Sequence, residues 1–355
     1  MQRTRRRSVT ISDVPDLSNS PFLRACRSEP TDHIPIWFMR QAGRSLPEYR
    51  ALKGETNILD AIKAPELATE LTLQPVRRYG VDAAILYSDI VVPVHALGFG
   101  VDIQAGIGPV VAAPFRTAAD LGRLRSLQPE ADVPYVLETV RLVVKELTVP
   151  LIGFAGAPFT VASYLVEGRP SREYLETRRM LWRDPELFAA LLDRLADAAL
   201  ASLRSQVEAG ASAVQLFDSW AGALEPADYR RAVLPSVAKI FHGLADLGVP
   251  RIASGVGTAE LLGMWSGAGA DVVSVDSSIT LDEARRRAGH AVAVQGNLDP
   301  WAVAVAPWDV VEAKTRAVLA SNAGRPGHVF NLGHGVRPET EPDTLQKIVD
   351  LVHGG

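Results

Sequence analysis

Short apolar runs recur along the chain from Pro21 onward, and each ends in small or polar residues before a helical pattern begins. Continuous apolar runs are typical of parallel strands, because helices cover one face and packed side chains fill the other. Several runs follow a glycine such as Gly80 or Gly210, where a left-handed glycine can end a helix and return the chain. We therefore predict eight strands, at 34–39, 83–87, 151–154, 213–217, 251–253, 272–275, 291–295 and 329–332.

One of the intervening helices has clear start and stop signals. Asp184 is suited to cap it, and Pro185 fits its first turn. Gly210 marks its end. Leucine and valine then recur on one face at spacings that are multiples of four, at positions 187, 191, 195, 203 and 207. The pattern predicts a long helix with one buried face.

Eight strands with intervening helices and no long polar linker favour a single-domain α/β fold, the closed (β/α)8 TIM barrel, over residues 20–355. A doubly wound open sheet is the alternative. Such sheets usually carry a glycine-rich phosphate loop, and this chain has neither GxGxxG after its first strand nor a P-loop. Residues 1–19 are arginine-rich but are followed by no apolar signal segment, and they contain two aspartates, so we expect a disordered basic tail.

Composition narrows the class of protein. The 355 residues carry a formal net charge of −4, which gives no basic field for nucleic acid or an anionic membrane. No apolar stretch approaches the roughly 18–20 residues that a membrane-spanning helix needs. Cys26 is the only cysteine, so an internal disulfide and a cysteine-based zinc site are excluded, and a reducing, cytoplasmic location is expected.

Candidate chemistry lies where the predicted strands end, because the active sites of such barrels form at the carboxyl ends of the strands. Taken singly, two arginines four apart are often solvated or salt-bridged, and an Asp after a strand often caps a helix. Convergence on one end of a barrel favours a binding site instead. The candidates are Arg40, Gln41, Ala42, Gly43, Arg44, Asp89, Tyr164, Ser219 and His334.

These side chains suit an anionic substrate with several oxygens. Guanidinium forks bind carboxylates bidentately and keep their charge. The lone Asp89 would face a cationic or N–H-rich partner. The chain has no HxH or HExxH pair, so no metal is expected. None of its six lysines directly follows a strand, so no pyridoxal phosphate is expected.

Five segments carry a family resemblance. MRQAGRSLPEY at 39–49, GFAGAPF at 153–159, FDSWAG at 217–222, QGNLDP at 295–300 and NLGHG at 331–335 resemble the uroporphyrinogen decarboxylase family. The resemblance extends from about residue 21 to 353, and the first motif is highly specific. It implies a (β/α)8 barrel, usually a homodimer, that needs no cofactor. The implied reaction removes carbon dioxide from the four acetate arms of uroporphyrinogen III to give coproporphyrinogen III for haem biosynthesis.

The resemblance also implies residue roles. Arg40 and Arg44, with the backbone of residues 41–43, would hold propionate and acetate groups. Asp89 would gather the pyrrole N–H groups, and Asp89 and Arg40 would be catalytic. Tyr164, Ser219 and His334 would make further substrate contacts.

The chain departs from the family pattern at a few positions. Ser277 stands where Trp is usual, Ala253-Ser254 where His-Phe is common, Arg169 where Gly is usual, and Arg337 where an apolar residue or Pro is frequent. Three alternatives to the decarboxylase remain open. They are a superfamily methyltransferase, which would need zinc ligands, a non-catalytic tetrapyrrole-binding barrel, and a barrel aldolase or isomerase, which would need a strand-end lysine or a phosphate loop.

Overall fold

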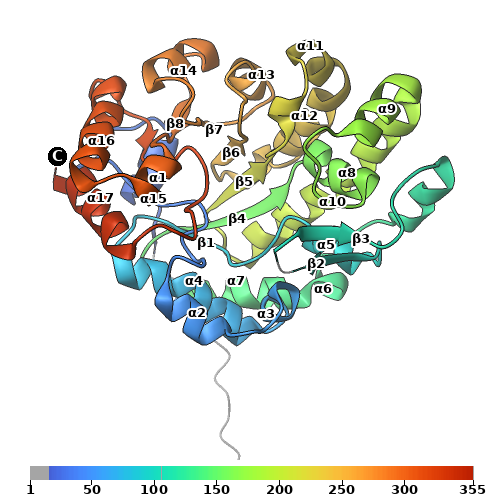
Figure 1. Ribbon diagram of the computed structural model, residues 1–355, viewed down its shortest axis with the longest axis horizontal. Coiled ribbons are helices and arrows are strands. Elements are labelled where there is room, and N and C mark those ends of the chain that lie inside the picture. The colour runs from blue at the N-terminus through green and yellow to red at the C-terminus, as the bar shows by residue number, and fades with distance from the viewer. Residues whose placement is uncertain (1–15, 105, 355) are drawn as a thin grey trace, which may run out of the picture.

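A computed structural model describes residues 16–104 and 106–354, and a parallel sheet lies at its centre. The sheet has seven strands in the order β1-β4-β5-β6-β7-β8-β9, so each strand pairs with the one that follows it around the sheet. Figure 1 shows the sheet curling, with helices around its outer side. The strands are β1 Ala84–Ile85, β4 Leu151–Gly156, β5 Ala213–Phe217, β6 Arg251–Ser254, β7 Val272–Ser274, β8 Ala293–Gln295 and β9 His328–Val329.

The first predicted strand, at 34–39, is not a regular strand, and this corrects the prediction of eight. The segment forms one parallel bridge, between Ile36 and Phe330. On one side, the Phe330 N–H donates to the Pro35 carbonyl at 2.8 Å, and on the other the Asp82 N–H donates to the Ile36 carbonyl at 2.8 Å. The ladder stays short because Pro35 has no N–H to donate and because the chain turns at Met39 and Arg40.

Polar side chains inside the sheet show how strongly it curls. The Gln295 side chain on β8 donates to the Gln215 side chain on β5 at 3.0 Å, although β6 and β7 lie between these strands. The Trp37 indole donates to Gln295 at 2.9 Å, so the 34–39 segment faces the same interior. These bonds satisfy polar groups that burial would otherwise leave unpaired.

Helices pack on the outside of the sheet. The long helix is confirmed: Asp184 accepts from the Leu187 N–H, Pro185 begins the helix, and Gly210 follows its last residue. The leucines of its predicted face at 187, 191, 195 and 203 are buried. The helices are α1 Pro21–Cys26, α2 Pro47–Lys53, α3 Ile58–Ile62, α4 Pro65–Tyr79, α5 Val92–Ala96, α6 Pro129–Asp132, α7 Pro134–Glu146, α8 Pro158–Glu167, α9 Leu175–Arg183, α10 Pro185–Ala209, α11 Pro226–Asp228, α12 Leu234–Gly243, α13 Leu262–Gly267, α14 Leu281–Ala288, α15 Pro300–Val305, α16 Trp308–Asn322 and α17 Pro342–Gly354.

A small antiparallel hairpin was not predicted. Its strands, β2 Val101–Gln104 and β3 Gly108–Val111, lie between β1 and β4 in the chain and form a separate two-stranded sheet. Val101 and Ile103 are buried while Asp102 and Gln104 are exposed. This alternation is the ordinary signal of a half-buried strand, but four residues give it little weight.

Most of the predicted tail at residues 1–19 lies outside the described residues. Its last part, from Asp16, is described and joins the domain through hydrogen bonds. The Ser20 N–H donates to the Leu17 carbonyl at 2.9 Å, and the Arg27 guanidinium donates to the Ser18 carbonyl at 3.0 Å. Within the described ranges, no helix combines the length and apolarity that crossing a bilayer requires.

Candidate functional site

The loop after the 34–39 segment is attached to the loop after β9. The Met39 N–H donates to the Asn331 side-chain oxygen at 3.1 Å, and the Val336 N–H donates to the Met39 carbonyl at 2.8 Å. Held on both sides, the chain turns at Arg40 with a left-handed φ of 62°, a conformation that residues other than glycine adopt only when the surroundings favour it. The result is a defined direction for the Arg40 side chain.

Arg40 and Arg44 are both exposed, and neither forms an ion pair with a carboxylate of the described residues. The Arg40 side chain lies over Gly335, because a Cβ built on that glycine would stand 2.5 Å from Cδ of Arg40. Many other arginines of the chain pair with Asp or Glu, as Arg251 does with Asp271 at 2.8 Å. Arg40 and Arg44 are therefore solvated and not salt-bridged within the described residues. Their guanidinium groups remain available to an anion.

The backbone of the same loop offers donors, but Gln41 does not contribute one. Its side chain is buried, accepting from the Phe38 N–H at 3.0 Å and donating to the Ala83 carbonyl at 3.1 Å. Its own N–H donates to the Phe38 carbonyl at 3.0 Å. The N–H groups of Ala42 and Gly43 have no acceptor among the described residues. Gln41 shapes the loop, and the next two residues present the donors.

Asp89 follows β1 and is half-buried. One carboxylate oxygen accepts from the Val91 N–H at 3.0 Å, in the turn before α5, and Asp89 does not cap that helix. The other has no hydrogen-bond donor in the part of the chain that the structure describes. Burial raises the pKa of Asp89, while the Val91 N–H and the charge of Arg40 lower it. The negative charge of the ionised carboxylate is therefore only partly balanced by its neighbours, which is typical of a group that binds a cationic partner.

The charge of Arg40 acts on both Tyr164 and His334. Burial raises the pKa of Tyr164, on α8, to about 12, with the charge of Asp89 adding to the rise. Burial lowers the pKa of His334 to about 4, with the charges of Arg40 and Arg337 adding to the fall. Arg40 is thus within electrostatic range of Asp89, Tyr164 and His334.

The protonation of His334 follows from its neighbour. The Gly335 N–H donates to Nδ1 of His334 at 2.6 Å, so that nitrogen carries no proton. In the neutral imidazole the proton must then lie on Nε2, which becomes a donor. His334 and Tyr164 are accordingly two neutral hydrogen-bond donors at this end of the sheet.

Ser219 is not joined to these four groups by a hydrogen bond within the described ranges. It is half-buried, and it lies between Asp218 and Trp220 after β5. The Trp220 ring packs edge-on against Tyr164, with centroids 6.1 Å apart. Ser219 therefore lies next to the site wall, and its hydroxyl remains a predicted contact.

Asp218, the residue before Ser219, is fully enclosed. Thr160 and Tyr229 donate to its two oxygens at 2.8 and 2.9 Å, and the Trp265 indole donates to the Tyr229 hydroxyl at 2.8 Å. Burial raises the pKa of Asp218 to about 6, against the two hydrogen bonds that lower it. The network fixes the strand end that carries Ser219 and Trp220.

Because Asp218 is buried, we expect the free energy of unfolding to depend on pH. Because its folded pKa lies above its unfolded value, the folded state binds more protons between about pH 4 and 6, and stability falls as the pH rises through that window. Two pKa units correspond to about 3 kcal/mol. Urea titrations of wild type and Asp218→Asn at pH 4.5 and 7.5 would give the unfolding free energy of each protein. We expect the stability advantage of wild type over the variant to fall by up to this amount between the two pH values. A difference that stays constant with pH would contradict the assignment.

The departures from the family pattern fall in different places. Ser277 and Arg169 are exposed, while Ser254 is buried and its carbonyl accepts from the Asp218 N–H at 2.7 Å. Arg337 lies near the site, since its charge lowers the pKa of His334. Its guanidinium stacks on the Trp301 ring at 3.9 Å, an arrangement that stabilises a cation without neutralising it. Arg337 thus adds positive charge at the rim.

The close approach of Arg40 to Gly335 gives a second prediction. A Cβ at Gly335 would lie 2.5 and 2.8 Å from Cδ and Cγ of Arg40, so Gly335→Ala must displace that side chain. Gly335 has no left-handed φ, so alanine suits its backbone. We expect kcat/KM for the substrate to fall about tenfold or more, with little change in Tm. Gly267→Ala, where a Cβ meets nothing within 4 Å, is the matched control. Equal activities of the two variants would show that the Arg40 position is not needed.

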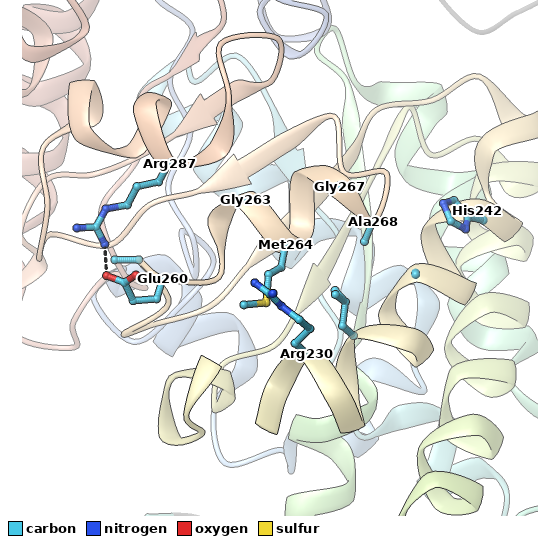
Figure 2. A pocket seen from close by; sticks show the side chains of 11 residues that line it. Arg230, His242, Glu260, Gly263, Met264, Gly267, Ala268 and Arg287 are labelled. Atoms are coloured by element: carbon cyan, nitrogen blue, oxygen red, sulfur yellow. Dashed lines mark hydrogen bonds and ion pairs between the residues drawn. The ribbon is translucent and has the colours of Figure 1, made fainter. Parts of the chain in front are cut away.

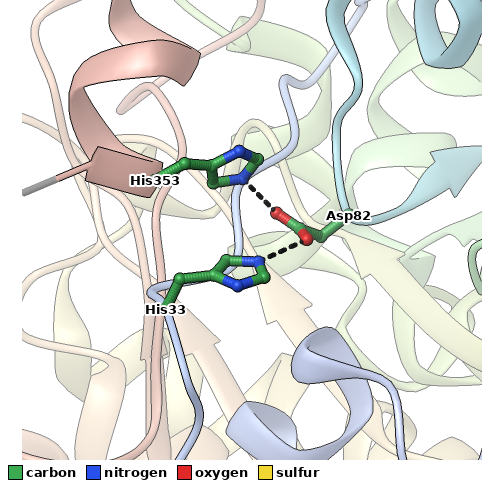
Figure 3. Close-up of side chains that lie close together, drawn as sticks. All are labelled: His33, Asp82 and His353. Carbon is green, nitrogen blue, oxygen red and sulfur yellow. Dashed lines mark hydrogen bonds and ion pairs between the residues drawn. The ribbon is translucent and has the colours of Figure 1, made fainter.

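Two other features lie away from this site. A cavity of about 560 Å³ lies between α12, α13 and α14, and none of the predicted site residues lines it (Figure 2). The group of His33, Asp82 and His353 is the one cluster of three potential metal-ligating residues among the described residues (Figure 3). It lies where the strands begin, at the opposite end of the sheet from Asp89. The strand-end site itself therefore offers no cluster of metal ligands among the described residues.

Comparisons of this sequence with a family model and with known proteins point to the same family. The family described as "Uroporphyrinogen decarboxylase (URO-D)" matches residues 17–355. Proteins named uroporphyrinogen decarboxylase are 61% identical in Streptomyces griseus, over 94% of this chain and 92% of that protein, and 56% identical in Thermobifida fusca, over 98% and 94%. One in Geobacillus kaustophilus is 51% identical over 94% and 97%. A solved structure of a methyltransferase from Methanosarcina mazei has a TM-score of 0.78 at 22% identity, covering 94% of this chain and 97% of that one, which is a likeness of fold alone.

Proposed function

The chain belongs to the uroporphyrinogen decarboxylase family, and we propose that it removes carbon dioxide from the four acetate arms of uroporphyrinogen III to give coproporphyrinogen III. The enzyme is then a carboxy-lyase of tetrapyrrole biosynthesis. The observation that carries the proposal is the Arg40 guanidinium, which pairs with no carboxylate of the described residues and lies within electrostatic range of Asp89, Tyr164 and His334. This set offers cations and neutral donors to a substrate rich in carboxylates, and one carboxylate to its pyrrole N–H groups.

Substrate carboxylates are bound by the loop after the 34–39 segment. Arg40 and Arg44 supply charge-assisted, fork-shaped donors, and the free N–H groups of Ala42 and Gly43 add backbone donors. Nε2 of His334 and the hydroxyl groups of Tyr164 and Ser219 are further donors. Such fixed donors orient the acetate arm and cost little reorganisation when the reaction proceeds.

The reaction needs an electron sink, and the substrate itself supplies one. A proton added to the alpha carbon of the pyrrole, next to the ring carbon that bears the acetate arm, makes the ring a conjugated iminium. The bond between the acetate CH2 and its carboxylate then breaks, carbon dioxide leaves, and the electron pair forms an exocyclic C=C bond while the ring nitrogen becomes neutral. A proton added to the exocyclic carbon forms the methyl group, and loss of the first proton restores the pyrrole. In sum, one proton replaces one carbon dioxide, so the scheme uses no metal and no organic cofactor.

Asp89 stabilises the charge that develops on the ring nitrogens. In the free enzyme the Val91 N–H and Arg40 compensate its carboxylate incompletely, as its raised pKa indicates. A positive ring brought against it gains more than a neutral ring does, so the interaction strengthens in the transition state. A water that the Arg40 guanidinium orients delivers the proton to the ring carbon, since the guanidinium itself keeps its charge.

We also propose that the sheet closes into a (β/α)8 barrel, with residues 34–39 as its eighth strand. The support is the hydrogen bonds of this segment to Phe330 on one side and Asp82 on the other. The predicted homodimer and the predicted cytoplasmic location rest on the family resemblance and on the single, buried cysteine, Cys26.

The test is direct. The purified, metal-free chain is incubated anaerobically with uroporphyrinogen III in the presence of a chelator, and the products are oxidised and separated by their number of carboxyl groups. Stepwise loss of four carboxyl groups is expected. Retention of all eight would overturn the proposal in favour of a tetrapyrrole-binding protein, and activity only after zinc is added would favour metal-dependent chemistry.

A further inference from the structure

Three side chains from distant parts of the chain meet at the end of the sheet where the strands begin. His33 precedes the 34–39 segment, Asp82 precedes β1, and His353 lies in the last turn of α17. Nε2 of His33 lies 2.8 Å from one oxygen of Asp82, and Nε2 of His353 lies 2.8 Å from the other. Figure 3 shows both imidazole rings directed at the carboxylate.

The distances suit a small metal ion. One ligand atom from each residue lies within 4.8 Å of the other two. In a tetrahedral zinc site with bonds of about 2.0 Å, neighbouring ligand atoms are roughly 3.3 Å apart. The two contacts of 2.8 Å are to different oxygens of Asp82. The contact to the oxygen that binds the ion would need to lengthen by about half an ångström, and the second imidazole would need to adjust within the 4.8 Å that spans the ligand atoms.

The chemistry of the donors also fits. Two imidazole nitrogens and one carboxylate oxygen form a ligand set that zinc accepts readily, with water in the fourth position. The carboxylate is already oriented, because one of its oxygens accepts from the Ile36 N–H at 2.8 Å. The two histidine side chains are each 30% exposed and that of Asp82 is 12% exposed, so an ion and a water can reach the site from solvent. With both imidazoles neutral, the group carries one negative charge.

We propose that His33, Asp82 and His353 bind one Zn²⁺ ion through the two Nε2 atoms and an oxygen of Asp82. The ion takes the place of the hydrogens that now lie between each imidazole and the carboxylate, and those protons move to Nδ1 or to solvent. The bound ion joins the 34–39 segment, the first strand of the sheet and the C-terminal helix. It stabilises the fold and takes no part in catalysis, because it lies at the opposite end of the sheet from Arg40 and Asp89.

This inference is independent of the proposed function. Activity in the presence of a chelator would show only that the reaction needs no zinc. Once the chelator is removed, the chain should bind zinc at this cluster whether or not it is active. The alternative is a cluster held by hydrogen bonds alone. His33→Gln separates the two, since glutamine keeps an N–H donor for Asp82 but is a poor zinc ligand.

The experiment uses the untagged full-length chain, stripped with chelator and titrated with ZnCl₂ by calorimetry, with Tm measured before and after. We expect one Zn²⁺ per chain and a higher Tm. His33→Gln and His353→Gln should weaken binding by more than about tenfold, since loss of even an outer partner of a ligand costs roughly 10- to 100-fold. His290→Gln, at an exposed histidine outside the cluster, should bind as wild type does. No binding to wild type, or binding that the two cluster variants leave unchanged, would overturn the proposal.

Discussion

Replacement of Asp89 by asparagine is expected to lower kcat about 100- to 1,000-fold, the usual cost of losing one preorganised electrostatic partner of the transition state. The charge of Asp89 meets the positive charge that develops on the pyrrole nitrogens, and asparagine cannot supply it. KM should change less, because the same amide can still accept a hydrogen bond from a pyrrole N–H in the ground state. Initial rates at several concentrations of uroporphyrinogen III would separate the two constants.

The variant should fold normally, and this makes the result interpretable. The asparagine oxygen can still accept from the Val91 N–H, which Asp89 does at 3.0 Å. Burial disfavours the ionised carboxylate, as the raised pKa shows, so removing the charge should leave Tm unchanged or raise it. Activity within about threefold of wild type, with Tm intact, would show that the carboxylate does not stabilise a positive ring.

Replacement of Arg40 by leucine is expected to lower kcat/KM by about 100- to 1,000-fold. A charge-assisted hydrogen bond contributes roughly 1.5–3 kcal/mol, and a guanidinium can make two to one carboxylate. Arg40→Lys keeps the charge and loses the fork, so an intermediate loss is expected. Arg316→Leu, at an exposed arginine that pairs with Glu312 on α16, is the matched control and should leave turnover unchanged.

A second measurement tests the position of Arg40 without relying on turnover. The charge of Arg40 is one of the causes that lower the pKa of His334, after burial. In Arg40→Leu the pKa of His334 should therefore rise, while burial keeps it below the ordinary value. Titration of the His334 ring by NMR would show this. A pKa of His334 that is the same in both proteins would mean that the guanidinium does not lie beside it.

Much of the fold was predictable because its signals are local. The run at 213–217 coincides with β5, and the run at 151–154 lies within β4, since buried parallel strands are continuously apolar. Asp184, Pro185 and Gly210 marked the ends of α10. The 34–39 run was equally apolar but forms only one bridge, because pairing depends on a neighbour across the sheet and on the missing N–H of Pro35.

The sequence names candidate residues for the site but does not show their geometry. Arg40, Asp89 and His334 follow predicted strands, and a parallel sheet with helical crossovers places those ends on one side. The chain alone does not show which arginines are paired, because Arg40 and Arg251 look alike until Asp271 is found beside only the second. It also does not show that the Gln41 side chain makes its hydrogen bonds to the backbone nearby. Nor does it show that the buried hydrogen bonds after β5 are made by Asp218.

The sequence by itself determined the alternation of buried strands and helices, the family, and the residues that stand at the strand ends, because each depends on neighbours along the chain. Tertiary structure alone decided the contacts between distant segments. Asp82 lies 49 residues from His33 and 271 from His353, and Met39 lies 292 from Asn331. Such contacts depend on how the sheet curls, and with them come the protonation of His334, the exposure of the Arg40 charge and the histidine–aspartate cluster.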